Sequence, residues 1–208
     1  MNKTLNKERK VTTINPATEE VLEEYQIISK GEIGDRIKKA QNAFQDWKKD
    51  TSKRSDTLHD FANELRKEKE YLAKTATNEM GKVIKEARSE VEKCAWVIEY
   101  YADNGKILST DEVVNTEARK TVIKFQPIGV IGSIMPWNFP YWQALRFAAP
   151  SLMVGNTIVL KPASAASATM QCGIEIERTF NKVGLPQGVF HNCRHVYWWA
   201  KCFYNRRQ

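Results

Sequence analysis

Apolar residues in the first half of the chain recur at every third or fourth position, with charged side chains between them. Three successive segments show this spacing, and they predict helices over residues 33–49, 55–81 and 84–105. Such a period places one apolar stripe on each helix, and the stripe must be covered by something else in the fold. We take Gly81 and Asn104–Gly105 as the stops of the second and third helices.

Extended segments lie on either side of this helical region. Two short runs around an Asn15–Pro16 turn predict a hairpin over residues 12–28. Residues 119–125 alternate in part, which suits an exposed edge or the arm of a hairpin, whereas residues 128–134 are almost wholly apolar. The second of these segments therefore predicts a buried strand.

Strands and helices alternate from Val130 onward. The pattern gives a helix over 142–152, a strand over 157–160 and a helix over 167–182 that stops at Gly184. Alternation of this kind is typical of parallel βαβ units. We predict an α/β fold in which helices cover both faces of a parallel sheet, preceded by an N-terminal helical segment.

Composition narrows the class of protein. A chain of 208 residues with 42% hydrophobic content is large enough for one globular domain. It contains no apolar run of about 18 residues, and residues 1–10 form a polar tail without a signal peptide, so we expect a cytoplasmic protein that does not enter a membrane. The four cysteines form no CxxC pair and have no zinc-site spacing with the three histidines, which predicts reduced thiols and no metal.

The net charge of +7 is unevenly distributed. The last 18 residues hold four cations and no acid, so the rest of the chain is nearly balanced. A nucleic-acid-binding domain concentrates its charge on a recognised module or on one element. The sequence therefore argues against a nucleic-acid partner.

Two short motifs carry a resemblance to a known family. The run Pro136-Trp137-Asn138-Phe139-Pro140 follows one predicted strand, and Leu160-Lys161-Pro162-Ala163-Ser164 ends the next. The first resembles the signature loop of the aldehyde dehydrogenase superfamily, and the second resembles its cofactor loop. The similarity runs from about Val11 to Phe190, and it includes Ile14–Thr18, Glu79–Lys82, Glu86–Val91 and Gly184–Phe190.

This resemblance implies an architecture. Residues 11–109 and 127–190 would form part of an NAD(P)-binding domain with an incomplete Rossmann-like sheet, and residues 110–126 would form a β-hairpin oligomerisation arm that reaches a neighbouring subunit. The arm could equally be a protected free edge. The segment 90–102 looks most like succinate-semialdehyde dehydrogenases, so the implied activity is oxidation of a small aldehyde, such as succinate semialdehyde, to a carboxylate in a homo-oligomer.

The signature loop would contribute to the chemistry. Asn138 matches the family's oxyanion-hole asparagine, whose amide donates to the charge that develops on the aldehyde oxygen. The alternative is that Asn138 caps the helix that begins near Tyr141. Four further residues would form part of the wall that orients the nicotinamide ring, although apolar side chains here also suit an ordinary core: Ile134, Met135, Pro136 and Trp137.

The second motif would bind the adenosine end of the cofactor. Lys161 follows a strand at the carboxyl edge, where open α/β sheets place ligands, and would bond the ribose hydroxyls or a phosphate on them. An ordinary exposed lysine is the alternative. Ser164 stands where many NAD-preferring relatives carry a glutamate that repels a 2′-phosphate, so the cofactor is NADP or NAD, with NADP favoured by Ser164.

Parts that the resemblance implies are not found. Family members are much longer and continue to a Glu-Leu-Gly-Gly segment with the general base and to a catalytic cysteine. Cys94 and Cys172 lie on helical stripes, which suits core packing, and Cys193 and Cys202 have no flanking motif. We assign no catalytic cysteine, and we expect the chain alone to be inactive and to bind cofactor weakly if at all.

The composition changes abruptly after Phe190. Residues 191–208 hold two of the four cysteines, two of the six tryptophans and two of the three histidines, which marks an aberrant C-terminal tail. One hypothesis is a frameshift that truncated a longer gene, because the codons for Tyr197-Trp198-Trp199 read one nucleotide later give Thr or Ile, then Gly, then Gly, as in a natural continuation. The other is a genuine short protein that docks on a full-length relative.

Overall fold

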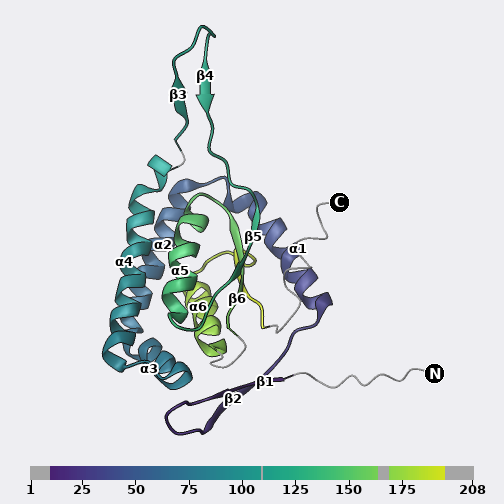
Figure 1. Ribbon diagram of the computed structural model, residues 1–208. Helices are drawn as coiled ribbons and strands as arrows, with labels where there is room; N and C mark the ends of the chain where they lie inside the picture. The colour runs from purple at the N-terminus through teal and green to yellow at the C-terminus, as the bar shows by residue number, and fades with distance from the viewer. Residues whose placement is uncertain (1–9, 109, 164–168, 195–208) are drawn as a thin grey trace, which may run out of the picture.

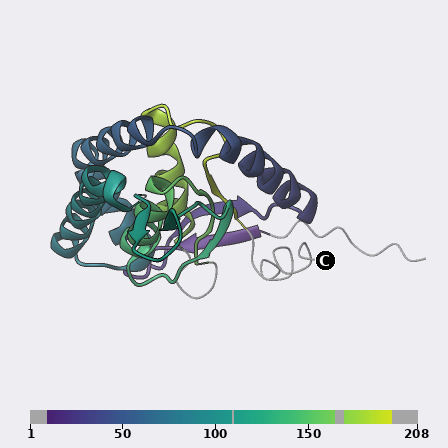
Figure 2. The ribbon, with the colours of Figure 1, turned by 90° about the horizontal axis from the view of Figure 1, so that it is seen from above.

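The computed structural model describes residues 10–108, 110–163 and 169–194. Figure 1 shows a helical bundle on the left, further helices beside it in the centre, then a parallel sheet, and a separate helix on the right. Seen from above in Figure 2, the bundle and this separate helix again lie on opposite sides of the molecule. The bundle consists of α2 (Thr51–Lys67), α3 (Lys69–Met80) and α4 (Ile84–Leu108), and the central helices are α5 (Pro140–Met153) and α6 (Met170–Lys182). The strands of the sheet are β5 (Val130–Ile134), β6 (Thr157–Lys161) and β7 (Phe190–Asn192), and the separate helix is α1 (Lys30–Trp47).

The sheet has the order β5-β6-β7, and all three strands are parallel. Side chains of the central strand β6 alternate between two separate cores. Ile158 and Leu160 belong to the main core with α5 and α6, whereas Val159 packs with α1. Helices therefore cover both faces of the sheet, which confirms the predicted α/β class.

Strand β5 corrects one expectation. The run 128–134 predicts a buried strand, yet Ser133 is the one buried residue of β5, while Ile131 is half-buried and Ile134 is exposed. The reason is position, because β5 forms an edge of the described sheet and has a strand on one side only. An apolar run shows that a strand is suited to burial, but it does not show how much of the strand the rest of the fold covers.

Helix α1 begins at Lys30, a little before the predicted start at residue 33. Ser29 is its N-cap, and the Ser29 and Glu32 side chains each accept a hydrogen bond from the other's backbone N–H, at 3.2 and 2.7 Å. This reciprocal capping box satisfies two N–H groups that the first turn would leave without partners. The predicted end near Lys49 is confirmed, since Lys48 is the C-cap.

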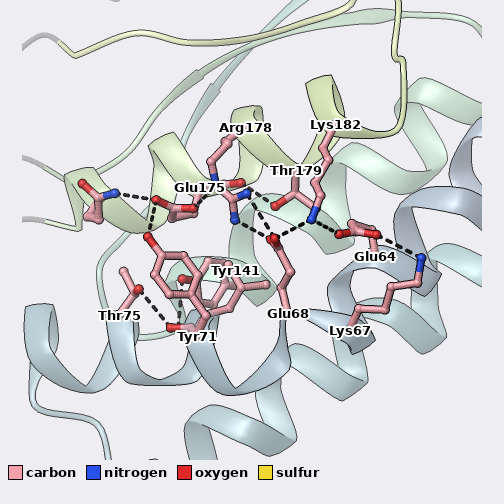
Figure 3. Close-up of polar contacts among 12 residues, drawn as sticks. Glu64, Lys67, Glu68, Tyr71, Thr75, Tyr141, Glu175, Arg178, Thr179 and Lys182 are labelled. Carbon is pink, nitrogen blue, oxygen red and sulfur yellow. Dashed lines mark hydrogen bonds and ion pairs between the residues drawn. The ribbon is translucent and has the colours of Figure 1, made fainter.

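The helix predicted over 55–81 is in fact two helices. α2 begins at Thr51 behind the N-cap Asp50, and the chain leaves helical geometry at Glu68 before α3 starts. The break turns the Glu68 carboxylate toward α6, where it binds Arg178 and Lys182 (Figure 3). Tyr71, in the first turn of α3, also donates to Glu175 of α6 at 3.0 Å.

The predicted stop at Asn104–Gly105 is wrong, because α4 continues to Leu108. A Cβ atom on Gly105 would lie 2.1 Å from Met153 Cε, so glycine here lets α5 approach α4 closely. Gly105 therefore serves packing inside a helix, and it does not end one.

Two hairpins extend from the body. β1 (Lys10–Ile14) and β2 (Val21–Gln26) pair in antiparallel fashion, as predicted, and Val11 and Tyr25 pack against Met170. β3 (Glu112–Val114) and β4 (Thr121–Ile123) form a second antiparallel hairpin that projects away from the helices in Figure 1. Within the described ranges, no helix has the length and apolar character needed to cross a bilayer.

Regular structure continues beyond Phe190. β7 runs to Asn192, and the next N–H, from Cys193, donates to the Leu160 carbonyl. Five buried side-chain atoms in the described ranges have no hydrogen-bond partner, and three of them belong to His191 and Asn192. The sheet thus accepts the backbone at this point, while the two side chains fit poorly; residues 195–208 of the expected tail lie outside the described residues.

Candidate active site

The two sequence motifs meet at one edge of the sheet. Ile134 at the end of β5 is in register with Lys161 at the end of β6, and the Met135 N–H donates to the Lys161 carbonyl at 3.1 Å. Because the strands are parallel, both motifs lie at their carboxyl ends, the edge where open α/β sheets bind ligands. A loop and a lysine far apart in the chain are thereby brought together.

The predicted wall residues differ in burial. Ile134 is 56% and Trp137 is 45% exposed, so an ordinary core position does not describe these two side chains. Met135 is half-buried and packs against the main core, and Pro136 is exposed. The exposed side chains give this edge of the sheet an apolar surface that a flat ring could cover.

Asn138 is not a helix cap. The N-cap of α5 is Phe139, and its own side chain makes no capping hydrogen bond. The N–H groups of Tyr141 and Trp142 donate instead to Glu90 Oε1, each at 2.9 Å. Asn138 is exposed and makes no hydrogen bond within the described ranges, so its amide is available to a ligand.

A buried ion pair lies directly behind this loop. Lys82 Nζ contacts Glu90 Oε2, and the two residues are only 7% and 4% exposed. Lys82 Nζ also lies 3.7 Å from the centre of the Phe139 ring. Neither residue has a role that is predicted from the sequence, although both lie in segments that carry the family resemblance.

Lys161 is half-buried, unlike an ordinary surface lysine. Its Nζ donates to the Pro162 carbonyl at 3.0 Å, and burial lowers its pKa. A partly desolvated ammonium group interacts more strongly with an anion than a fully hydrated one does. Ser164, the other expected cofactor residue, lies outside the described residues.

The cysteines of the described ranges offer no nucleophile. Cys94, Cys172 and Cys193 are each 0% exposed, and burial raises the pKa of Cys94 and of Cys172. A reactive cysteine needs an accessible thiolate. In the same ranges no three His, Cys, Asp or Glu residues gather as metal ligands would.

Comparison with known proteins accounts for the paired motifs. The model of the Aldehyde dehydrogenase family matches residues 4–195. The chain belongs to the aldehyde dehydrogenase family. The match extends on both sides of the similarity seen in the sequence between Val11 and Phe190, and its C-terminal end includes β7.

Individual aldehyde dehydrogenases show the same pattern. A probable succinate-semialdehyde dehydrogenase (NADP(+)) of Synechocystis sp. is 41% identical over 181 residues, which are 86% of this chain and 39% of that protein. A succinate semialdehyde dehydrogenase (NAD(P)+) of Escherichia coli K12 is 37% identical over 179 residues, 86% of this chain and 38% of that protein. The chain thus spans about two fifths of the length of these relatives.

A solved structure has the same fold. The succinic semialdehyde dehydrogenase of Streptococcus pyogenes, in complex with NADP+, superposes with a TM-score of 0.85 at 32% identity. The superposition covers 90% of this chain and 41% of that one. The arrangement of helices and sheet described above is therefore the arrangement of an aldehyde dehydrogenase N-terminal region.

Proposed function

We propose that residues 134–138, Lys161 and Ser164 form the cofactor-binding and oxyanion part of an NADP-dependent aldehyde dehydrogenase that oxidises succinate semialdehyde in the cytoplasm. One observation carries the proposal: the Met135–Lys161 hydrogen bond joins the Asn138 loop to the cofactor lysine at the carboxyl edge of the sheet. The activities of the Synechocystis and Streptococcus pyogenes proteins, as their names give them, support both the aldehyde and NADP.

Each side chain has a separate task in this proposal. The Lys161 ammonium binds the adenosine ribose or its 2′-phosphate, and Ser164 contributes a hydroxyl in place of a repelling carboxylate. The exposed Ile134 and Trp137 side chains pack on the nicotinamide ring, with Met135 and Pro136 completing the wall. When bound, the cofactor supplies the hydride acceptor.

Asn138 supplies the electrostatic part of the chemistry. Its side-chain amide donates a hydrogen bond to the oxygen on which negative charge develops, a contribution that is typically about 3 kcal/mol of barrier lowering. The nucleophilic cysteine and the general base of the intact enzyme are not among the described residues, where each cysteine is buried. We therefore propose that the 208 residues by themselves do not turn over aldehyde.

Replacing Lys161 with methionine tests the cofactor assignment. We expect the dissociation constant for NADP+ to rise by about tenfold or more, because one charge-assisted hydrogen bond is lost. The constant for NAD+ should change less, since NAD+ has no ribose phosphate. The measurement is a titration in which saturation-transfer NMR monitors cofactor binding. This method detects the weak binding expected here.

The control is Lys106→Met, which removes one positive charge at an exposed position on α4. Incubation with succinate semialdehyde and NADP+ should produce no NADPH. Equal NADP+ affinity in the wild type and Lys161→Met, or a clear preference for NAD+, would contradict the cofactor assignment.

The projecting hairpin supports a second candidate role as a docking element. Val113 is 75%, Ile123 is 47% and Phe125 is 54% exposed, which is a large apolar surface for a narrow hairpin. We propose that this arm, residues 110–126, joins copies of the chain or docks it on a full-length relative. Exposed apolar side chains concentrated on a projecting element commonly mark protein interfaces.

Replacing Val113 with lysine should weaken that association. Burying an ammonium group in an apolar contact is unfavourable, so the dissociation constant measured by sedimentation velocity should rise by at least about tenfold. Val21→Lys is the matched control, since Val21 is 62% exposed on the other hairpin. A monomeric wild type that also fails to bind a full-length relative would rule out this role.

A further inference from the structure

We propose that Lys82 and Glu90 are positioning residues, which hold the loop 136–139 in the geometry that presents Asn138 and Trp137 at the site. The inference rests on the proposed function, because that loop is the part of the site that would contact the nicotinamide and the aldehyde. Both residues are buried. Their contacts pass through Phe139 and through the first turn of α5.

Glu90 acts on the loop through the backbone that follows it. Its Oε1 accepts the N–H groups of Tyr141 and Trp142, each at 2.9 Å. Pro140, at the first position of α5, has no N–H to satisfy. The carboxylate therefore takes the place of a local N-cap, and its negative charge suits the positive end of the helix dipole.

Lys82 acts on the loop through a side chain. Its Nζ pairs with Glu90 Oε2 and lies 3.7 Å from the centre of the Phe139 ring. A cation over a ring face is an attractive contact with a defined direction, and it is stronger where water is excluded. The pair thereby holds the Phe139 side chain as well as the backbone N–H groups of Tyr141 and Trp142.

The other end of the loop is fixed separately. The Met135 N–H bonds to the Lys161 carbonyl, so the loop is a short span between two anchored ends. Between these anchors the Asn138 side chain is exposed and makes no hydrogen bond within the described ranges. Asn138 is held in position by its neighbours in the chain and not by bonds of its own amide. The amide therefore stays available to a ligand while its position is kept.

Other charged pairs in the described ranges have a different geometry. Arg66 with Glu99, and Arg178 with Glu68, are partly exposed and join one helix to another. The pair Lys82–Glu90 is buried, and its further contacts converge on Phe139, Tyr141 and Trp142. A role confined to stability predicts loss of the whole fold on substitution, whereas a positioning role predicts a local change in the loop.

Fluorine NMR of the chain labelled with fluorotryptophan separates these roles. The resonance of Trp137, assigned by its loss in Trp137→Phe, reports the loop. The resonance of Trp47 reports the fold, because Trp47 is 3% exposed and its indole N–H donates to the Leu152 carbonyl at 3.1 Å. Both signals are read without cofactor.

Two substitutions are compared. The double variant Lys82→Met/Glu90→Gln removes the ion pair without leaving a lone buried charge, and Phe139→Leu removes only the ring contact. In both, we expect the Trp137 resonance to shift and broaden while the Trp47 resonance stays in place. Lys82→Arg, which keeps the charge, should stay close to the wild type, as should a control double variant of an exposed pair, Arg88→Met/Glu70→Gln.

The NADP+ titration follows on the same samples. We expect the double variant to bind NADP+ about tenfold more weakly than the wild type, because the loop must then be ordered on binding. If the wild type itself does not bind NADP+, the proposed function fails, while the resonance of Trp137 still decides the positioning role. Two results together overturn the inference. The Trp137 resonance is unchanged in Phe139→Leu, and the double variant either unfolds or also leaves this resonance unchanged.

Discussion

Replacing Arg54 with methionine is expected to lower the free energy of unfolding by about 3 to 5 kcal/mol. Arg54 is 2% exposed and lies where two helices end. Its guanidinium donates to the carbonyls of Trp47, the last residue of α1, and of Met153, the last residue of α5, at 2.8 and 2.7 Å. Methionine keeps much of the volume but leaves both buried carbonyls without a donor.

Urea unfolding measures this change through the transition midpoint at constant slope. Arg88→Met is the matched control, since Arg88 forms an exposed pair with Glu70 and its loss should change the free energy of unfolding little. The loss of stability in Arg54→Lys should lie between the losses in Arg88→Met and Arg54→Met, because a single ammonium group cannot reach both carbonyls with the same geometry. A cost for Arg54→Met as small as that of Arg88→Met would show that water replaces the guanidinium at the two helix ends.

The second large effect is a dependence of stability on pH that originates in Glu79. This carboxyl group is 2% exposed and accepts the N–H groups of Gln171 and Cys172, in the first turn of α6. Burial raises its pKa to about 7, and the hydrogen bonds from the helix offset only part of that rise. The neighbouring Tyr141 and Cys172 also have pKa values raised by burial, so they stay neutral and supply no compensating charge.

The direction of the pH effect follows from the higher pKa in the folded state. Below about pH 4.5 the carboxyl is protonated in both states; between there and about pH 7 it is ionised only in the unfolded chain, so stability falls as the pH rises. The total fall is about 3 kcal/mol, from a shift of about 2.5 pKa units at about 1.36 kcal/mol each. Above that range the contribution is constant.

Glu79→Gln should remove this part of the pH profile when urea midpoints are compared across the range. The difference between the two proteins is the quantity to plot, because it subtracts the titration of the histidines. Glu70→Gln is the control, since Glu70 is exposed and its pKa is lowered by Arg88, so its effect should appear only under more acidic conditions. Parallel profiles for the wild type and Glu79→Gln would show that Glu79 stays charged throughout.

The sequence predicts well those features that depend on neighbours along the chain. The spacing of apolar residues places the helices, and the Asn15–Pro16 turn is visible as a local pattern. The βαβ order and the two family motifs also place the Asn138 loop and Lys161 at one edge of a parallel sheet. Each of these inferences needs only a period, a short motif or the handedness of a connection.

Features that depend on distant partners are missed. Gly105 is typical of a helix end in sequence, and only the position of Met153 shows why glycine is required inside α4. Glu79, Glu90 and Arg54 look like ordinary charged residues on helices, yet each satisfies the end of another helix. No local pattern distinguishes a charge that faces solvent from one that faces a helix terminus.

The change of composition after Phe190 has a counterpart in the structure that the sequence alone does not reveal. The backbone of His191 and Asn192 continues β7, but His191 Nε2 and both polar atoms of the Asn192 side chain are buried without partners. A strand at this place would normally carry apolar or β-branched side chains. The poor fit therefore lies in the side chains and not in the fold.

Helix α5 has consequences for the order in which the molecule assembles. The N–H groups of its first turn are satisfied by Glu90 from α4, and the carbonyl of its last residue, Met153, is satisfied by Arg54 from α2, so both ends depend on residues far away in the chain. Contacts between segments far apart in sequence form late, because closing the long loop costs entropy before any contact is gained. The loop that carries Asn138 can thus reach its final geometry only after the helical bundle has assembled, and a folding intermediate without that bundle would have no competent site.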